Sequence, residues 1–276
     1  MLNARKHLAR RRWRRFATPR LFATLSVTDD RLARQRTAVA EQAALCYNGA
    51  MCGRFTLHTD PRILAKLFGL DETPYLEPRY NIAPTQPIAA VANTGENKVD
   101  FFTWGLIPFW AKDPSIGSRM INARSETLAE KPSFKTAYKR RRCLVLADGF
   151  YEWKKEPDSK TKTPMYIQLE SQQPFAFAGL WESWHNGDGS HILSCTIITT
   201  APNSLMVNIH NRMPVILSPD AYPQWLDPAE KKPSDLQDLL QPYPPEEMTA
   251  FPVSRAVNNP RNDSPECVVP LKGLFD

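Results

Sequence analysis

Five short stretches of the chain carry side chains that could do chemistry. The first is MCGRF at residues 51–55, where Cys52 has no apolar run around it and is followed by Gly53 and Arg54. We therefore expect an accessible thiol in a positive field, the setting of a reactive cysteine. The other stretches are PRYNIAPTQ (78–86), WGLIPFWAKD through INARSET (104–127), ADGFYEWKK (147–155) and NIHNRMPVIL (208–217).

Single residues in these stretches also have ordinary structural explanations. Asn122 could be a turn residue, and Glu152 could lie at a solvated strand edge. His210 could be a buried histidine whose hydrogen bonds are satisfied within the protein. A cysteine, a histidine and a carboxylate together also permit a papain-like triad. Because the cysteine comes first, directly after a methionine that reads as a chain start, the order favours N-terminal nucleophile chemistry over that triad.

The excess positive charge of the chain lies entirely in its first 50 residues. They hold ten Arg and one Lys against three acidic side chains, a net of +8, whereas the whole chain carries +6, so the remainder has a net of −2. This leader lacks the apolar run of a secretory signal. Its composition favours a misassigned start, while a transit peptide, a processed pro-segment and a basic nucleic-acid arm stay open. We expect residues 1–50 to be a disordered leader or a misassigned start, and residues 51–276 to form one domain.

The cysteines argue against metal and disulfide chemistry. They are far apart, with no paired spacing and no histidine at zinc-site distance, which favours a reduced cytoplasmic setting without cofactors. Cys143 and Cys195 lie in apolar runs and are expected to be buried. No stretch approaches the length of a membrane span. The five cysteines are Cys46, Cys52, Cys143, Cys195 and Cys267.

Short β-rich runs dominate the remaining pattern. Strands are expected at 87–92, 100–104, 142–147, 164–170, 174–180, 191–200 and 214–217, since each run is bounded by Pro, Gly or Asp. Two helices are expected where a capping residue precedes a proline, after Asp60 with a stop at Gly69, and after Ser218. We predict an α+β fold, predominantly antiparallel β, with a barrel-like sheet and short flanking helices.

The five stretches, in this order and spacing, resemble the SOS response-associated peptidase (SRAP) family, whose members sense abasic sites in single-stranded DNA. The match runs from Cys52 to the C-terminal VNNPRND and CVVPL segments. In that family the initiator methionine is removed and the next residue, here Cys52, becomes the N-terminus. The resemblance therefore implies removal of residues 1–51. It also implies a thiazolidine crosslink, in which the α-amine and the thiol of Cys52 both bond to the aldehyde carbon of an opened abasic sugar.

The resemblance also implies roles for three catalytic partners of Cys52. Asn122 would hydrogen-bond the Cys52 amine and orient it. Glu152 would act as a general acid and base, which requires burial to raise its pKa, and the neighbouring Tyr151 and Trp153 are expected to supply that burial. His210 would be a second proton shuttle.

DNA contacts are expected from local groups because the domain is slightly acidic. Arg54, Arg124 and Arg212 each lie within two residues of a proposed catalytic position and are expected to form a phosphate track. Trp110, beside Phe109, is expected to stack on an exposed base. Asn81 and Pro84 are expected to line the pocket, and the run 140–142 of three arginines to form a solvated face. The predicted DNA-binding residues are Arg54, Asn81, Pro84, Trp110, Arg124 and Arg212.

Two other functions stay open from the sequence. The same residues would serve a self-processing cysteine peptidase in which Cys52 cleaves the bond before it, and a noncovalent nucleic-acid-binding module is a third possibility. If the chain is an abasic-site sensor, its expected partner is single-stranded DNA containing abasic sites, and neither a metal nor a membrane is expected. The chain is then expected to be a monomer, cytoplasmic and associated with the nucleoid when bound to DNA.

Overall fold

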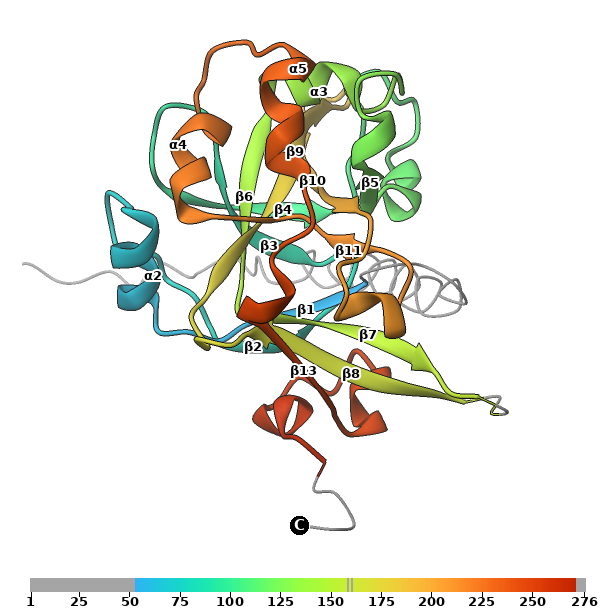
Figure 1. Cartoon of the computed structure of the whole chain (residues 1–276). Coiled ribbons are helices and arrows are strands. Elements are labelled where there is room, and N and C mark those ends of the chain that lie inside the picture. The colour runs from blue at the N-terminus through green and yellow to red at the C-terminus, as the bar shows by residue number, and fades with distance from the viewer. Residues whose placement is uncertain (1–52, 158, 160, 272–276) are drawn as a thin grey trace, which may run out of the picture. The chain divides into compact units, whose positions relative to one another are not determined.

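The computed structural model describes residues 53–157, 159 and 161–271 (Figure 1). The predicted leader at 1–50 and the predicted nucleophile Cys52 lie outside the described residues. The domain is built on two sheets, and Asp148 alone separates strand β6 (Arg142–Ala147) of the larger sheet from strand β7 (Gly149–Lys155) of the smaller one.

Five strands of the larger sheet close on themselves. The pairings run from β4 (Val99–Trp104) to β3 (Pro87–Ala92), then to β6 (Arg142–Ala147), β9 (Phe175–His185) and β10 (His191–Thr200). Strand β10 then pairs with β4 in parallel, while every other pairing in the ring is antiparallel. The result is a small mixed barrel whose interior is filled by side chains. The predicted α+β fold with a barrel-like, mainly antiparallel sheet is therefore confirmed.

Three short strands attach to the barrel. Strand β5 (Asn122–Arg124) runs parallel to β10, and β11 (Met213–Pro214) pairs with the same strand in the antiparallel direction. Strand β12 (Ile216–Leu217) pairs with β9. β10 is thus the common support for β5 and β11, which lie far apart in the sequence.

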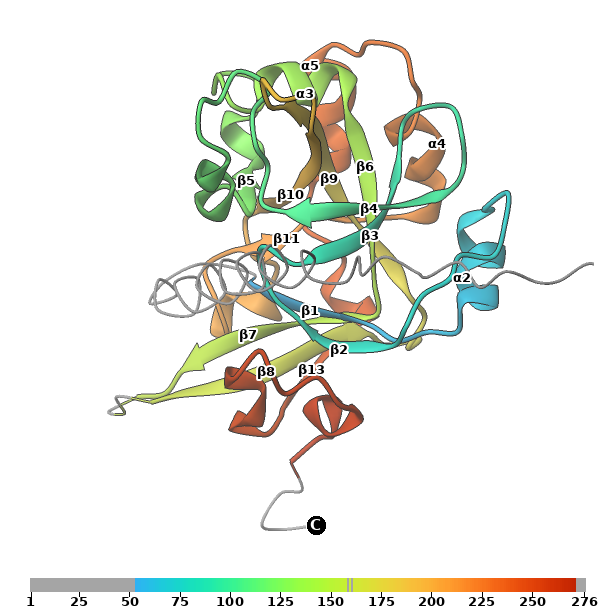
Figure 2. The same ribbon diagram turned by 180° about the vertical axis from the view of Figure 1, so that it is seen from behind.

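The second sheet contains five antiparallel strands. Their order is β13 (Met248–Pro252), β8 (Lys162–Leu169), β7 (Gly149–Lys155), β1 (Arg54–Leu57) and β2 (Arg79–Ile82). The barrel covers one face of this sheet, as both views show (Figures 1 and 2). Phe55 of β1 joins the two layers, because its ring contacts Trp104 edge-on at 5.1 Å and Phe177 at 5.9 Å. Burying such rings between layers is a main source of stability in a domain of this type.

The helices are short and lie outside the sheets. Helix α2 (Pro61–Phe68) begins after Asp60, whose carboxylate accepts from the backbone N–H of Arg62 at 2.8 Å, and ends at Gly69 with a φ of 59°. Both predicted ends are thus confirmed. The helix predicted after Ser218 starts as a 3-10 turn and continues as α4 (Tyr222–Trp225). The others are α3 (Lys135–Arg140) and α5 (Pro233–Leu236).

The barrel core confirms one prediction and corrects another. Cys143 and Cys195 are fully buried, as expected. The prediction that the 140–142 run forms a solvated face is wrong for Arg142, which is also fully buried. Its guanidinium donates to five backbone carbonyls, which satisfies its N–H groups and ties α3 to the segment after α4. The acceptors are Tyr138, Lys139, Trp225, Asp227 and Ala229.

The described residues contain neither a membrane-spanning helix nor a cluster of metal-ligating side chains. No helix in this part of the chain has the length and apolar character to cross a bilayer. No three His, Cys, Asp or Glu side chains in the same part gather as a metal site would require.

Candidate functional site

Glu152 is buried beside the first described residues of the chain. Strand β7 pairs with β1 through Arg54 opposite Tyr151 and Phe55 opposite Phe150. Glu152 follows directly after the last paired position, so it lies next to Gly53, where Cys52 is attached. Its side chain is only 2% exposed. The structure thus brings a buried carboxyl group to the place where the predicted nucleophile joins the domain.

The burial of Glu152 has a different source from the predicted one. Side chains alternate between the two faces of a strand. Phe150 packs in the main core, whereas Tyr151 and Trp153 pack in a separate cluster with Tyr166. Glu152 therefore shares the barrel-facing side of β7 with Phe150. The expectation that Tyr151 and Trp153 cover this carboxyl is wrong, because those rings lie on the opposite face.

Tyr151 and Tyr166 support the site from that opposite face. Tyr151 donates its hydroxyl to the carbonyl of Tyr80 at 2.7 Å, and its ring lies 5.1 Å from that of Tyr166. Burial raises the pKa of both phenols well above the usual value, so both stay protonated. Their role is to fix β7 against β2 and β8.

Arg54 anchors the start of β1. Its guanidinium donates to Oδ1 of Asn81 at 2.9 Å and to the carbonyl of Val257 at 2.8 Å, and it lies 5.9 Å from the centre of the Trp153 ring. The last contact is a cation–π arrangement. Arg54, predicted to grip phosphate, is thus also a structural anchor two residues from Cys52.

Asn81 lies beneath the site and not on its surface. It is fully buried, and its amide donates to three backbone carbonyls at 2.8–3.1 Å. Pro84, also predicted to line the pocket, is buried as well. The acceptors of the Asn81 amide are Val257, Asn259 and Asn262.

The C-terminal segment 257–263 forms a wall that the sequence analysis did not use. Trp153 donates its indole N–H to Oδ1 of Asn258 at 2.7 Å. Asp263 accepts from the backbone N–H of Asn81 at 2.9 Å and pairs with Arg79. The VNNPRND motif was a signal for these contacts, because Asn and Asp are the side chains that bond to nearby backbone groups.

Asn122 and Arg124 are positioned by the parallel pairing of β5 with β10. Asn122 lies opposite Ile197 and is half-buried, whereas Arg124 lies opposite Thr199 and is exposed. Arg124 makes no ion pair with any described residue. Of the three predicted phosphate contacts, it is the one whose side chain is turned to solvent.

His210 follows the 3-10 turn Met206–Asn208, which is held by the bond from the His210 N–H to the Met206 carbonyl at 2.8 Å. Nδ1 of its half-buried ring accepts from the backbone N–H of Arg212 at 3.3 Å. A neutral imidazole with Nδ1 as acceptor carries its proton on Nε2. His210 is therefore oriented to donate from Nε2.

Arg212 joins the His210 turn to the 3-10 turn Ser125–Thr127 after β5 and to β10. It forms an ion pair with Glu126 and donates to the carbonyl of Thr199 at 2.7 Å. The hydrogen bond from Arg212 holds the pKa of Glu126 below its usual value. This arginine is 14% exposed and already has an anionic partner. Glu126 was missed by the sequence analysis, although it follows Arg124 closely in the same motif.

Strand β7 and the turn that carries His210 both lie near the start of β1. Both views place the turn before β11, in orange, beside β7 near the start of β1 (Figures 1 and 2). Phe109 and Trp110, in the loop after β4, are 56% and 49% exposed. The structure thus places the buried carboxyl of Glu152 next to Gly53 and leaves the side chains of Phe109, Trp110 and Arg124 exposed.

Comparison with known proteins decides the family. Residues 51–260 match the family model described as "SOS response associated peptidase (SRAP)". The chain belongs to the SRAP family. This confirms the resemblance drawn from the five motifs.

Similar proteins are found in bacteria and vertebrates. The abasic site processing protein YoqW of Bacillus subtilis is 50% identical over 222 residues, covering 79% of this chain and 99% of that protein. The abasic site processing protein HMCES of Xenopus tropicalis is 36% identical over 203 residues, covering 65% of this chain and 59% of that protein. A solved structure from Bacteroides thetaiotaomicron superposes with a TM-score of 0.72 at 28% identity, covering 80% of this chain and all of that one.

Proposed function

We propose that this SRAP protein recognises abasic sites in single-stranded DNA and captures them covalently through Cys52. The burial of Glu152 next to Gly53 carries the proposal, because it provides a proton-transfer group where the nucleophile is attached. The names of the curated relatives, abasic site processing proteins, support abasic DNA as the substrate.

The proposed reaction uses both nucleophiles of an N-terminal cysteine. The α-amine adds to the C1′ aldehyde of the opened abasic sugar, and loss of one water leaves an imine. The thiol then adds to the same carbon, its proton passes to the imine nitrogen, and a five-membered thiazolidine results. No oxidant or cofactor is needed. The ordinary pKa values of an α-amine and a thiol lie about 0.7–1.5 units above pH 7, so a fraction of each group is reactive at neutral pH.

The neighbouring groups fit the proton transfers of this sequence. Glu152 protonates the hydroxyl that leaves as water and accepts protons from the amine. Nε2 of His210 donates toward the opening sugar, and Asn122 orients the amine. Asn81 acts from beneath by fixing Arg54. Trp110 and Arg124 are the proposed contacts to base and phosphate. Pro84, Arg54 and Arg212 are further proposed contacts along the DNA path.

The proposal requires removal of residues 1–51, so that the α-amine of Cys52 is free. Residues 1–50 are proposed to be a leader or a misassigned start, and the catalytic domain to begin at Cys52. A chain that retains the leader has only the thiol at this position, and a thiol alone forms a reversible hemithioacetal.

Intact-mass measurement tests the proposal. We compare a chain started at Met51 with one started at residue 1, after incubation with an oligonucleotide containing one abasic site. The first is expected to lose its methionine and form an adduct that survives denaturation, and its Cys52→Ser variant to form none. Adduct formation by a chain that still carries residues 1–51 would refute the mechanism.

A second candidate, a self-processing cysteine peptidase, is favoured by the family description. In this case Cys52 would cleave the bond that precedes it. The full-length Cys52→Ser chain separates the candidates, because only self-processing predicts that this variant accumulates uncleaved while the parent is shortened in a purified reaction.

A further inference from the structure

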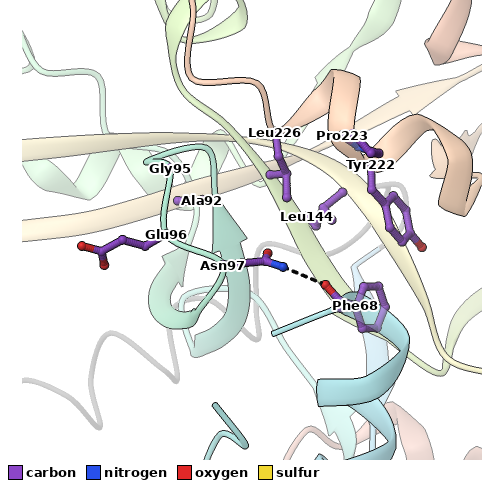
Figure 3. Close-up of a pocket in the computed structure, with 9 residues that line it drawn as sticks. All are labelled: Phe68, Ala92, Gly95, Glu96, Asn97, Leu144, Tyr222, Pro223 and Leu226. Atoms are coloured by element: carbon purple, nitrogen blue, oxygen red, sulfur yellow. Dashed lines mark hydrogen bonds between the residues drawn. The ribbon is translucent and has the colours of Figure 1, made fainter. Parts of the chain in front are cut away.

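Two apolar hollows lie on the side of the domain formed by α2 and α4. The first has a volume of about 320 Å³ and is shown in Figure 3. Its apolar walls are Phe68, Ala92, Leu144, Tyr222 and Leu226. Asn97 donates to the carbonyl of Phe68 at 3.1 Å, which fixes the end of α2 against the β3–β4 turn. The hollow is therefore framed by ordered segments.

Tyr222 also lines the second hollow, which has a volume of about 480 Å³. Leu67, Leu169, Phe175, Leu217 and Tyr243 supply its apolar lining. Phe68 stacks on Tyr222 with ring centroids 5.5 Å apart, so this pair of rings forms the ridge between the two hollows. We call the two hollows and the ridge the α2–α4 surface.

The apolar character continues onto the outer face of α2. Ile63 is 50% exposed and Leu67 38% exposed, and their spacing of four residues places them on one side of the helix. Leu64 and Phe68 already provide the buried side of α2. The exposed pair does not pack on the core, and Leu67 also lines the second hollow, so exposed apolar side chains adjoin that hollow.

The rim of the second hollow is acidic. Glu170, Glu246 and Glu247 line it, and among the described residues that line either hollow none is Lys or Arg. Tyr243 donates to Glu247 at 3.0 Å; burial and this carboxylate raise the pKa of Tyr243 to about 12, so the donor stays protonated. The rim repels phosphate and attracts cations.

We propose that the α2–α4 surface docks a segment of another protein that combines large apolar side chains with Lys or Arg. One apolar side chain fills each hollow across the Phe68–Tyr222 ridge, and the cationic groups lie against Glu170, Glu246 and Glu247. In protein interfaces, apolar side chains buried in pockets usually provide most of the affinity, and complementary charges at the rim provide specificity.

This surface is separate from the proposed DNA site. Both views place α2 and α4 on one side of the domain, and β5, β11 and the outer end of β7 on the other (Figures 1 and 2). A partner on the α2–α4 surface leaves the exposed Trp110 and Arg124 available. The protein would then hold DNA and a second protein at once.

Selection from a random phage-displayed peptide library against the intact protein tests the proposal. We expect the enriched peptides to carry at least two Leu, Ile, Phe or Trp residues together with Lys or Arg. Their affinity, measured by fluorescence anisotropy, should fall about tenfold in the Glu246→Lys/Glu247→Lys double variant and in Leu67→Ser. It should also weaken with added salt.

The matched control is the double variant Glu130→Lys/Glu266→Lys. It makes the same charge change at two exposed positions that do not line the α2–α4 surface. It should bind the peptides as the parent does. Absence of enrichment, enriched peptides without basic residues, or equal loss in both double variants would overturn the proposal. Crosslinking to abasic DNA is measured in parallel, so failure of the proposed function is recorded independently of peptide binding.

Discussion

Arg54 donates to Oδ1 of Asn81 at 2.9 Å, and both side chains bond to the carbonyl of Val257. One group of hydrogen bonds thus holds together the start of β1, the end of β2 and the C-terminal segment. Because Cys52 is attached two residues before Arg54, these hydrogen bonds fix the chain at the point from which the proposed nucleophile extends. An error of about 1 Å at a reacting group can cost two orders of magnitude in rate.

Asn81→Ala should therefore lower both stability and crosslinking. Removing the amide leaves a half-buried guanidinium and three carbonyls with fewer partners, a cost of about 1–3 kcal/mol. Crosslinking should slow by about tenfold under conditions where the variant is folded. Chemical denaturation and adduct formation over time measure the two effects.

Asn93→Ala is the matched control for this variant. Asn93 is also buried, accepts from the backbone N–H of Arg142 at 2.8 Å and donates to the carbonyl of Arg140, but it contacts no segment of the candidate site. It should lose comparable stability and keep the parental crosslinking rate. Equal loss of crosslinking in both variants would mean that Asn81 acts only through stability.

Glu152→Gln should separate binding from chemistry. The amide keeps the shape of the side chain but cannot transfer a proton, so crosslink formation or its reversal should slow by about 10²–10⁴-fold while affinity for single-stranded DNA is kept. Glu182→Gln is the control, since Glu182 is also buried, at 3% exposure, but lies in β9 and pairs with Arg141. Parental rates in Glu152→Gln would remove this residue from the mechanism.

The barrel was predictable from the sequence because its strands carry continuous apolar runs. Residues 87–92, 142–147 and 191–200 were expected as strands and are strands with the same bounds. The helix at Asp60 was equally predictable, since its N-cap and its terminal glycine act locally. These signals depend on a few neighbouring residues, so they can be recognised without knowledge of the rest of the fold.

The strands that carry the site were not predicted. β1, β2, β5 and β7 contain the motif residues Arg54, Asn81, Asn122 and Glu152, whose polar side chains hide the strand pattern. Their burial depends on pairing with distant segments, as in the parallel pairing of β5 with β10. The order of the motifs indicated which residues form the site. The residues that bury Glu152 and the ion pair of Arg212 with Glu126 depend on contacts between distant segments, so they could be seen only in the structure.

Glu126→Gln should increase affinity for single-stranded DNA. The change removes a 52% exposed carboxylate and frees the Arg212 guanidinium that it holds. Arg124→Ala should do the opposite and flatten the log–log dependence of affinity on salt by about 0.7, the value for one phosphate contact. Salt titrations of both variants measure these slopes, and an unchanged slope in Arg124→Ala would contradict its place in a phosphate track.

The same ion pair predicts a small dependence of stability on pH. Because Arg212 lowers the pKa of Glu126 in the folded state, the pair stabilises the fold above the unfolded pKa of about 4.3 and this contribution disappears as the pH falls through the lower, folded value. Exposure of Glu126 limits the effect to about 1 kcal/mol. Denaturation of the parent and Glu126→Gln from pH 7 to pH 3 should show the difference between them shrinking toward acid.

Trp110→Ala tests base stacking at the exposed loop after β4. Trp110 is 49% exposed, so its removal should leave the free energy of unfolding nearly unchanged. If a base stacks on the indole, affinity for single-stranded DNA should fall by about 1–3 kcal/mol, which is roughly five- to 150-fold. Phe101→Ala is the control, because Phe101 is a 56% exposed aromatic residue on β4 that no proposed contact uses. Fluorescence anisotropy with an undamaged oligonucleotide measures binding without the covalent step, and equal affinities of the Trp110 and Phe101 variants would show that the indole does not contact DNA.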